Sequence, residues 1–437
     1  MVIKNSPRCV LILGPSFAFA DQIAPLIDLI AKENKVLNLK VILPSPQIAL
    51  EFDQAWFPAR KIEQYTAEAV FRTYSGEWLS CSSLEEAARS ARAISIVGRL
   101  KRKVNLLGLA WVEKILIYLE QNLLARKGLT PLSIENPTIS PGSLVFFDLT
   151  EVRKPYFGDL LSSVSESKCI AIMHGLGFLN PNKEEKWAHE NERIERIVKS
   201  TVVFSQSTSE TLYYSEVVGV PYKNIRKTGV LRHDSGWLSQ LCGPSERHGK
   251  PGREFLLLVS IPIGPWLPWW RKFQNLRALK SAARRHGLQI MVKRHPKERR
   301  DGSLIAGLGI PWKTSGWALS KSHLLNLAWR SEFAVAFDSG ACLDFLRIGL
   351  PTIQLLNLSG LSNVADAENN GSDTQPVSPY VKAGVVLHAT DKRSLLHAIV
   401  ELQNERETWL ARMEKNFRSE FFPTLDVEEI GSIVREI

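Results

Sequence analysis

Short apolar runs alternate with longer amphipathic segments along the first 240 residues. The apolar runs are 9–14, 39–45, 144–150, 168–175 and 201–207. Each run is apolar throughout, which is typical of a strand covered by helices on both faces of its sheet. Residues 19–34 carry a helical repeat, and residues 84–128 are rich in Arg, Lys and Leu in a helical pattern. The pattern predicts a doubly wound parallel sheet.

Residues 241–255 interrupt this alternation with glycine, proline and charge, which indicates a linker. Strands are predicted again at 255–261, 288–296, 332–340, 351–356 and 384–390, with helices at 271–287, 320–331, 341–349 and 391–417. Residues 363–379 are predicted to form a polar loop.

The fold class is therefore α/β, with two Rossmann-like domains that face each other across a cleft. The predicted parts are an N-terminal domain (1–240), a linker (241–254), a C-terminal domain (255–400) and C-terminal helices (401–437) that cross back to the first domain. Ligands of such domains bind at the carboxyl ends of the strands.

Charge and composition narrow the function classes. The 437 residues carry a net charge of +10, which suggests a polyanionic partner, namely nucleic acid, a phosphorylated substrate or an anionic membrane. A generally basic proteome explains the charge equally well. The five cysteines are scattered without a CxxC pair, which predicts neither disulfides nor a zinc site. No apolar run is long enough to cross a bilayer, and 9–14 is too short for a signal peptide, so we expect a cytoplasmic protein.

Lys293, Arg294, His295 and Pro296 end the predicted strand that starts at 288. Proline stops the strand ladder and restricts the residue before it, so His295 is expected to be held rigidly at the carboxyl edge of the sheet. An imidazole among cations suits a phosphate. A solvated strand end with an incidental histidine is the plainer alternative.

A second polar turn follows the strand predicted at 332–340. Asp338, Ser339 and Gly340 stand between that strand and a helix, where free N–H groups can bind an anion and glycine permits close approach. An ordinary helix cap would explain the same residues. Because both turns fall on one sheet edge, we favour a phosphate site.

These two motifs together resemble the C-terminal half of GT-B glycosyltransferases that act on bacterial capsule and wall polymers. That group includes capsule polysaccharide transferases, sialyl- and polysialyltransferases, Kdo transferases and CDP-glycerol glycerophosphotransferases. The resemblance rests on Lys293 to Pro296, then Asp338 to Asp344, then "RIGLPTI". It implies that His295 and Ser339 bind the phosphate of a CMP- or CDP-linked donor, and that Asp344 binds the donor ribose. Gly340 departs from the pattern, since a second hydroxyl residue is usual there.

The first domain resembles the same group in two places. "IAIMHG" ends in His174 and Gly175 like the strand–HG turn of the glycerophosphotransferases, and "VGVPYKNIRKTGVLRHD" matches a segment common before the GT-B linker. The second match implies donor-side roles for Gly229 and Arg232. The resemblance covers roughly residues 168–360 by motif.

A transfer reaction also requires a base for the acceptor hydroxyl. His174 is the first candidate, followed by Asp148 and Asp21, and Gly14 and Ser16 are expected to line the acceptor side. No DxD motif is present, so we predict metal-independent transfer. No cofactor is implied beyond the nucleotide-sugar donor, which is a substrate.

The predicted function is therefore transfer of a sugar or polyol-phosphate from a nucleotide donor to a surface polysaccharide or other glycan acceptor, including a lipid-linked one. One alternative is a nucleotide-sugar epimerase of the same architecture, whose histidine-rich and arginine-glutamate motifs are not found. Another is a basic nucleic-acid-binding protein, but no RNA- or DNA-binding signature is present, and we expect no nucleic-acid partner.

A further segment combines aromatic and basic residues. Trp266, Trp269 and Trp270 precede the basic helix 271–287. This composition suits an anionic membrane surface at the inner face of the membrane, or stacking on sugars, although a solvated core helix explains it as well.

Overall fold

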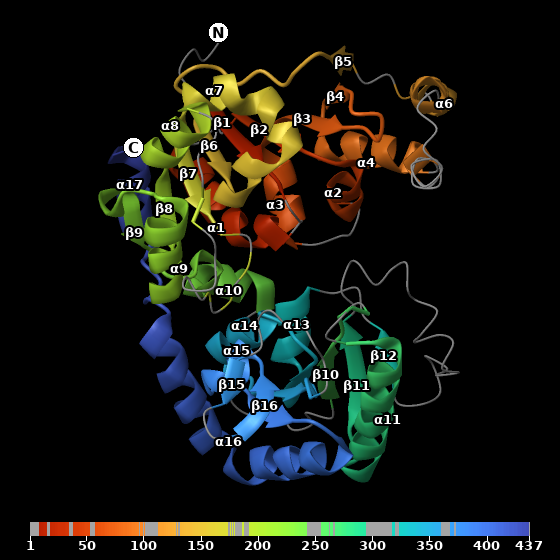
Figure 1. The fold of residues 1–437 in the computed structure, drawn as a ribbon, viewed down its shortest axis with the longest axis vertical. Coiled ribbons are helices and arrows are strands. Elements are labelled where there is room, and N and C mark those ends of the chain that lie inside the picture. The colour runs from red at the N-terminus through yellow and green to blue at the C-terminus, as the bar shows by residue number, and fades with distance from the viewer. Residues whose placement is uncertain are drawn as a thin grey trace. The chain divides into compact units, whose positions relative to one another are not determined.

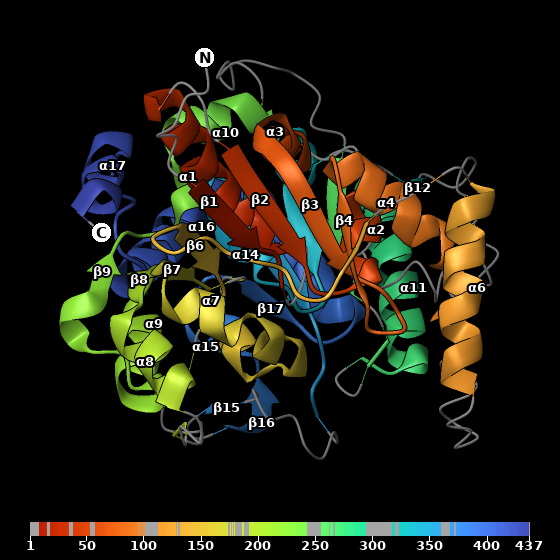
Figure 2. The same cartoon turned by 90° about the horizontal axis from the view of Figure 1, so that it is seen from above.

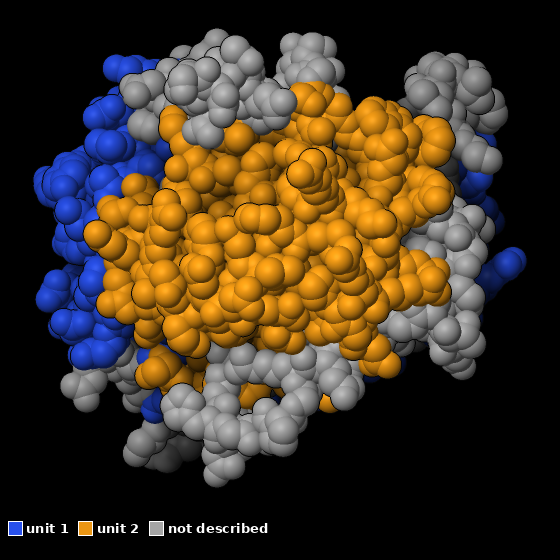
Figure 3. Space-filling model, turned by 90° about the horizontal axis from the view of Figure 1, so that it is seen from below, with its two compact units in different colours: residues 1–175, 179–234, 422–437 blue, residues 176–178, 235–421 orange. Residues whose placement is uncertain are grey.

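The computed structural model describes residues 8–14, 18–34, 38–52, 57–95, 97–98, 100, 112–127, 129, 132–173, 175, 177, 179, 186–187, 192–242, 255–261, 263–264, 267–293, 317–319, 323–359, 368–370 and 373–436. The chain divides into two compact units. Unit 1 takes Met1–Gly175, Leu179–Asp234 and Phe422–Ile437, and unit 2 takes Leu176–Phe178 and Ser235–Phe421. Figure 1 shows their elements, and Figure 3 shows one face of unit 2 in orange.

Unit 1 is built on a nine-stranded sheet. In spatial order its strands are β5 (Leu132–Ile134), β4 (Trp78–Cys81), β3 (Thr66–Arg72), β2 (Asn38–Leu43), β1 (Arg8–Ile12), β6 (Leu144–Phe147), β7 (Lys168–Ile172), β8 (Val202–Ser205) and β9 (Ile225–Lys227). All neighbouring pairs are parallel except β3–β4 and β4–β5, which are antiparallel. The prediction of a parallel sheet is confirmed for β1–β3 and β6–β9 and is wrong at this edge.

The helices of unit 1 connect these strands. They are α1 (Ala18–Asn34), α2 (Pro46–Phe52), α3 (Phe57–Tyr65), α4 (Leu84–Ala93), α6 (Val112–Arg126), α7 (Leu161–Ser165), α8 (Glu192–Ser200), α9 (Thr208–Leu212) and α17 (Val427–Glu436). Shorter turns are η1 (Leu149–Arg153), η2 (Pro155–Leu160), η4 (Tyr213–Val218), η5 (Tyr222–Asn224) and η6 (Leu231–His233). Helices α1 and α3 lie on one face of this sheet, and α7 and α8 lie on the opposite face (Figure 2).

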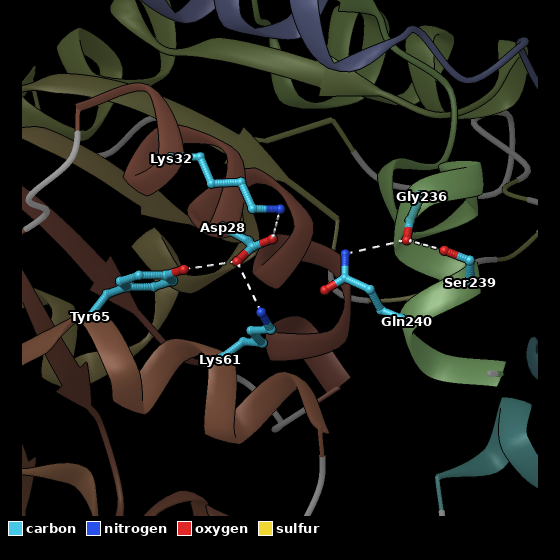
Figure 4. A network of polar contacts seen from close by, with 7 residues as sticks. All are labelled: Asp28, Lys32, Lys61, Tyr65, Gly236, Ser239 and Gln240. Carbon is cyan, nitrogen blue, oxygen red and sulfur yellow. Dashed lines mark hydrogen bonds and ion pairs between the residues drawn. The ribbon is translucent and has the colours of Figure 1, made fainter. Parts of the chain in front are cut away.

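A buried carboxylate joins two of these helices. Asp28 of α1 accepts from Tyr65 Oη at 2.9 Å and pairs with Lys61 Nζ at 3.4 Å, both on α3, and with Lys32 Nζ at 2.7 Å (Figure 4). Burial acts to raise the pKa of Asp28, but the hydrogen bonds and positive charges outweigh it, so the pKa is lowered. The Lys61 ion pair and the Tyr65 hydrogen bond therefore join α3 to α1. The same figure shows a separate local network in α10 (Ser235–Cys242), where Ser239 and Gln240 donate to the Gly236 carbonyl.

Unit 2 contains a six-stranded sheet that is parallel throughout. Its spatial order is β12 (Trp317–Leu319), β11 (Gln289–Lys293), β10 (Phe255–Val259), β13 (Phe333–Ala336), β14 (Thr352–Leu355) and β17 (Leu387–Ala389). The helices are α10 (Ser235–Cys242), α11 (Trp269–Arg285), α13 (Leu324–Trp329), α14 (Ala341–Arg347), α15 (Pro379–Lys382) and α16 (Lys392–Glu420). This order, 3-2-1-4-5-6 in chain sequence, is the Rossmann arrangement.

Most of the elements predicted for this second half are confirmed, with one correction. The polar stretch 363–379 is not a plain loop, because it contains the antiparallel pair β15 (Glu368–Asn370) and β16 (Asp373–Val377). The predicted linker 241–254 begins with two residues that end α10, and the rest of it lies outside the described residues. Helix α16 runs through position 400 without ending, with one non-helical residue at Glu405.

The two cores consist of the apolar strands that the sequence pattern marks. Leu11 and Ile12 of β1 and Phe146 of β6 are fully buried, as are Leu257 and Leu258 of β10. Burying each such side chain stabilises the fold by about 1.5–3 kcal/mol. The sheets are therefore rigid supports for whatever lies at their edges. None of the helices in the described part of the chain is long and apolar enough to cross a membrane.

The C-terminal segment of unit 1 packs on Gly229. This glycine has φ of +66°, and a Cβ there would lie within 2.7 Å of the backbone nitrogen of Thr424. The Leu425 N–H donates to the Thr228 carbonyl at 2.9 Å, which fixes the segment in place. This close backbone approach accounts for a glycine at position 229 without a ligand.

Replacing Gly229 with alanine should destabilise unit 1 more than the same change at Gly142. Both residues have positive φ, but a Cβ at Gly142 meets nothing within 4 Å. We expect G142A to cost about 1 kcal/mol through backbone strain alone, and G229A to cost about 3 kcal/mol or more because the Pro423–Thr424 backbone must also shift. Thermal unfolding of both variants tests this, and equal shifts in Tm would contradict it.

Candidate functional site

The order in which strands are added to the unit 2 sheet reverses at β10. From β10 the chain passes to β11 on one side, and it later returns to β13 on the other side. Val259 at the end of β10 is in register with Lys293 of β11 and with Ala336 of β13. The three strands therefore end at one edge, and such a reversal point is where open α/β sheets bind ligands.

The turn after β13 carries three of the predicted site residues. Asp338, Ser339 and Gly340 are each half-buried. Ser339 Oγ accepts from the Ala341 N–H at 3.3 Å, and its carbonyl accepts from the Cys342 N–H at 3.2 Å. Gly340 occupies the N-cap of α14 and has ordinary helical angles. The serine thus closes the first turn of α14, as the alternative of a plain helix cap predicts, and its hydroxyl still lies at the sheet edge.

A buried glutamine that the sequence reasoning missed fixes this turn. Gln354 of β14 donates from Nε2 to the Phe337 carbonyl at 3.2 Å and to Asp338 Oδ1 at 3.3 Å. Its Oε1 accepts from Ser378 Oγ, and Ser378 caps α15. The side chain therefore ties the Asp338 turn to two further elements. The sequence signal for Gln354 was its position as a polar residue inside the apolar run "PTIQLL".

The first turns of α11 fasten the neighbouring loops. Lys272 is 2% exposed, and its Nζ donates to the Ile261 carbonyl after β10 at 2.5 Å. Asn275 Nδ2 donates to the Leu355 carbonyl at 3.1 Å, and Arg271 donates to the Asn357 and Ser359 carbonyls. These side chains hold the segments that follow β10 and β14. Buried cations and amides paired in this way make the edge preorganised.

Asp344, the predicted ribose ligand, is 6% exposed on α14. Burial raises the pKa of the neighbouring Cys342 thiol well above its usual range, and the negative charges of Asp338 and Asp344 add to the increase. The two carboxylates therefore both lie close to this thiol. A ribose-binding role for Asp344 stays a prediction.

The cationic motif lies partly outside the described residues. Lys293 ends β11, is half-buried, and its carbonyl accepts from the Ser260 N–H at 3.0 Å. Arg294, His295 and Pro296 fall outside the described residues. Within the ranges that the structure describes, no group of three or more His, Cys, Asp or Glu side chains is placed to hold a metal ion. Metal-independent transfer stays a prediction.

Unit 1 has a corresponding reversal point between β1 and β6. Gly14, just after β1, is buried, and a Cβ there would collide with the Glu151 carboxylate and lie 2.8 Å from Tyr156 Oη. Tyr156 donates to that same carboxylate. A side chain at position 14 would displace the Glu151 carboxylate and the Tyr156 hydroxyl, so close packing favours glycine there. Ser16 lies outside the described residues.

Asp148 directly follows β6 and is fully buried. One of its oxygens accepts from the Thr150 N–H at 2.8 Å and from Thr150 Oγ1 at 2.6 Å, so it caps η1. Its local bonds account for the residue, and a role as general base stays a prediction. Asp21 lies in the first turn of α1 and is half-buried. His174, the first candidate for that role, lies outside the described residues.

A second buried carboxyl lies near Asp148. Glu210 of α9 is 3% exposed. Its Oε2 accepts from the Gln206 N–H at 3.0 Å, and its own N–H donates to Ser207 Oγ at 3.1 Å. Burial raises the pKa of Glu210 to about 8 against the effect of the Gln206 N–H, and the charge of Asp148 adds to the increase. The Ser-x-x-Glu spacing of a capping box was the sequence signal for this residue.

The two remaining predicted donor-side residues belong to unit 1. Gly229 packs against Pro423 and Thr424 as described above. Arg232 is half-buried in η6. Lys293 and the Asp338–Asp344 segment belong to unit 2. The predicted residues therefore form two groups, one at the β10 edge of unit 2 and one in unit 1.

Comparison with known proteins identifies the architecture. No family model matches the chain, and no curated protein matches it. A solved structure of a putative UDP-N-acetylglucosamine 2-epimerase from Listeria monocytogenes is similar over 98% of this chain and 95% of that chain, with TM-score 0.50 and 12% identity. A variant of the wall teichoic acid polymerase TagF is similar over 99% and 88%, with TM-score 0.51 and 9% identity. A structure of the same polymerase soaked with CDPG is similar over 98% of this chain and 87% of that chain, with TM-score 0.50 and 9% identity.

The chain has the GT-B fold. Identities this low show the fold alone, because unrelated chemistries share one architecture. The predicted fold class of two Rossmann-like α/β domains is confirmed. The chemistry depends on the residues at the sheet edges.

The Glu210 carboxyl should make the stability of the protein fall as pH rises from about 4.5 to about 8. In the folded protein it keeps its proton up to pH about 8, whereas the unfolded chain releases it near 4.5. The folded state thus binds more protons in this window, so deprotonation destabilises it, by an order of a few kcal/mol. Thermal unfolding measured across this pH range tests the effect.

Glu210→Gln is the decisive variant for that titration. It keeps the shape of the side chain and removes the proton equilibrium, so the Tm of this variant should decline less with pH than that of the wild type. Glu216→Gln, an exposed change six residues away, is the matched control. Parallel pH profiles for wild type and Glu210→Gln would show that Glu210 does not titrate in this window.

Proposed function

We propose that the protein is an enzyme acting on a nucleotide-activated sugar, and that the carboxyl edge of the unit 2 sheet binds the nucleotide phosphate. One observation carries this proposal. Strands β11 and β13 both border β10 in parallel register and end at the same edge. The cationic motif that starts at Lys293 and the Ser339 turn follow directly from these two strands.

The spacing of the strands supports a shared anion. Two strands that flank a third lie about 10 Å apart. A diphosphate with its hydrogen-bonding shell can bridge that gap when side chains extend from both strands. The phosphate ligands are His295, Arg294 and Lys293 from one side and Ser339 with the N–H groups after it from the other.

The reaction proposed is transfer to an acceptor hydroxyl. The bond between the donor carbon and the nucleotide phosphate oxygen breaks, the acceptor oxygen bonds to that carbon, and a base takes the hydroxyl proton. For a polyol-phosphate donor, the acceptor oxygen attacks phosphorus instead. Negative charge grows on the departing nucleotide, and fixed cations and N–H groups stabilise it. Lys293, Arg294 and His295 supply this stabilisation, and Ser339 orients the phosphate.

The acceptor side is assigned to unit 1. His174 is the leading base because it follows β7, which lies between β6 and β8 in the sheet. Asp148 and Glu210 are both buried, and the Asp148 charge raises the pKa of Glu210. Burial and the neighbouring negative charge favour the protonated form of Glu210. Asp21 and the Gly14 turn are the remaining acceptor-side candidates.

The donor class follows from the resemblance of the two motifs and from one fold neighbour. The motifs match transferases that use CMP- or CDP-linked donors, and the polymerase of similar fold was soaked with CDPG. We therefore propose a cytidine-linked donor, and a surface glycan or lipid-linked glycan as acceptor, in the cytoplasm.

Epimerisation of a nucleotide sugar is the second candidate. The observation in its favour is that the putative UDP-N-acetylglucosamine 2-epimerase shares the fold over nearly the whole of both chains. An epimerase would need the nucleotide site but no acceptor. Incubation with UDP-N-acetylglucosamine alone, followed by product analysis, distinguishes the two, since only the epimerase yields a new sugar without an acceptor.

Nucleotide binding should raise the Tm of the protein in a residue-dependent way. At a nucleotide concentration of about 100 times Kd, the folded state gains about 2.7 kcal/mol, so we expect CMP or CDP to raise the Tm by about 5 °C or more. His295→Ala and Ser339→Ala should each reduce this rise by at least half. Differential scanning fluorimetry with a panel of nucleotides measures it.

Matched variants in the same unit serve as controls. Ser281→Ala on α11 and His286→Ala at its C-cap change the same residue types away from the β10 edge, and both variants should keep the full nucleotide response. Each variant is also measured without nucleotide, because Ser339→Ala removes a local hydrogen bond. The proposed site would be overturned if no nucleotide raised the Tm. It would also be overturned if His295→Ala and Ser339→Ala each showed the same nucleotide-induced rise as the wild type.

A further inference from the structure

Helix α11 buries one face in unit 2 and leaves the opposite face exposed or half-buried. At 100° per residue, the outward positions fall within about 160° of arc. They are Trp269, Trp270, Phe273, Gln274, Arg277, Lys280, Ser281, Arg284 and Arg285. All of them are exposed or half-buried, whereas Leu276, Leu279, Ala282 and Ala283 on the opposite face are buried. We propose that this outward face docks on the surface of an anionic membrane.

The aromatic side chains gather at one end of that face. Trp269 is 60% exposed and Trp270 is 42% exposed. The Arg271 guanidinium lies 4.9 Å from the Trp270 ring centroid, and the Arg277 guanidinium lies 5.6 Å from that of Phe273. The two tryptophan rings lie outside the buried core, to which α11 contributes Leu276, Leu279, Ala282 and Ala283. An aromatic ring beside a cation is the arrangement that suits the boundary between headgroups and acyl chains.

The charges on the face point to anionic lipid. The helix contains no acidic residue in its 17 positions, and four cations lie outward along the three turns after the aromatic end. A cluster of this kind is attracted to phosphate headgroups, and the net charge of +10 adds to the attraction. A soluble polyanion would use the cations but leave the tryptophans in water. The combination of both therefore favours a bilayer surface.

This docking is of the peripheral kind. None of the described helices could cross a membrane, so contact would be made by a helix lying in the interface. The inference goes beyond the proposed enzymatic function and does not depend on it. A protein without transferase activity could bind membranes through α11, and a transferase could lack this contact.

Vesicle flotation with the full-length protein tests the proposal. The probes are vesicles of phosphatidylcholine alone and of phosphatidylcholine mixed with phosphatidylglycerol. We expect the protein to float with the mixed vesicles at low salt, to bind the neutral vesicles at least tenfold more weakly, and to dissociate as salt is raised. Failure to float with anionic vesicles at low salt overturns the proposal.

Two variants divide the aromatic and charged contributions. The first variant combines Trp269→Ala with Trp270→Ala. The second combines Arg277→Gln, Arg284→Gln and Arg285→Gln. Each variant should bind the mixed vesicles at least tenfold more weakly than the wild type. The controls are Tyr118→Ala with Tyr222→Ala, which remove exposed rings in unit 1, and Lys392→Gln with Arg393→Gln, which remove exposed cations on α16. The controls should bind as the wild type does.

The remaining outcomes are also decisive. Unchanged binding by the tryptophan variant shows that the face is only a cationic patch and overturns membrane docking. Weakening by the controls to the same extent shows that binding is not located on α11. Binding to heparin but not to vesicles assigns the face to a soluble polyanion. The Tm and nucleotide response of each variant confirm that it is folded, and they test the enzymatic proposal separately.

Discussion

The parallel pairing of β10 with β11 on one side and β13 on the other is the constraint on which the account of unit 2 depends. Backbone hydrogen bonds fix Val259 opposite both Lys293 and Ala336. A parallel strand cannot slip by one residue without moving its buried side chains to the wrong face of the sheet. The two turns that follow β11 and β13 are therefore held at one edge by the core itself.

Buried polar side chains fix the loops at this edge of the unit 2 sheet. Lys272 secures the loop after β10, Asn275 the end of β14, and Gln354 the Asp338 turn. Each of these side chains is at least nine-tenths buried, so its hydrogen bonds operate away from water and are costly to break. A rigid edge of this kind suits a site that must stabilise charge as a bond breaks, because the donors need not reorganise. In unit 1, Asp148 and Glu210 are both buried, and the charge of Asp148 adds to the rise in the pKa of Glu210.

The strands of both cores could be predicted because continuous apolar runs admit few other structures. The runs that contain β1, β6, β7, β8, β10 and β13 were found in this way. Strands β3, β4, β5, β9 and β12 were not predicted. Strands β4, β5, β9 and β12 are only three or four residues long, and β3 carries Glu68 and Arg72 among its apolar residues, so none of the five is a long continuous apolar run. The β15–β16 hairpin was missed because its sequence, rich in Asn, Asp and Gly, is also typical of a loop. Gln354 and Lys272 could not be assigned roles, since their function depends on partners about 10 and 20 residues away in the chain that only the fold brings near.

The most direct measurement for the shared phosphate site is hydrogen–deuterium exchange with and without a saturating cytidine nucleotide, read by mass spectrometry over the whole chain. The account predicts that the nucleotide slows exchange in two separate stretches of unit 2, one covering residues 289–297 and the other 336–343, with α16 as an unaffected internal reference. Slower exchange in only one of these stretches, or confined to unit 1, would show that the two turns do not bind one anion together.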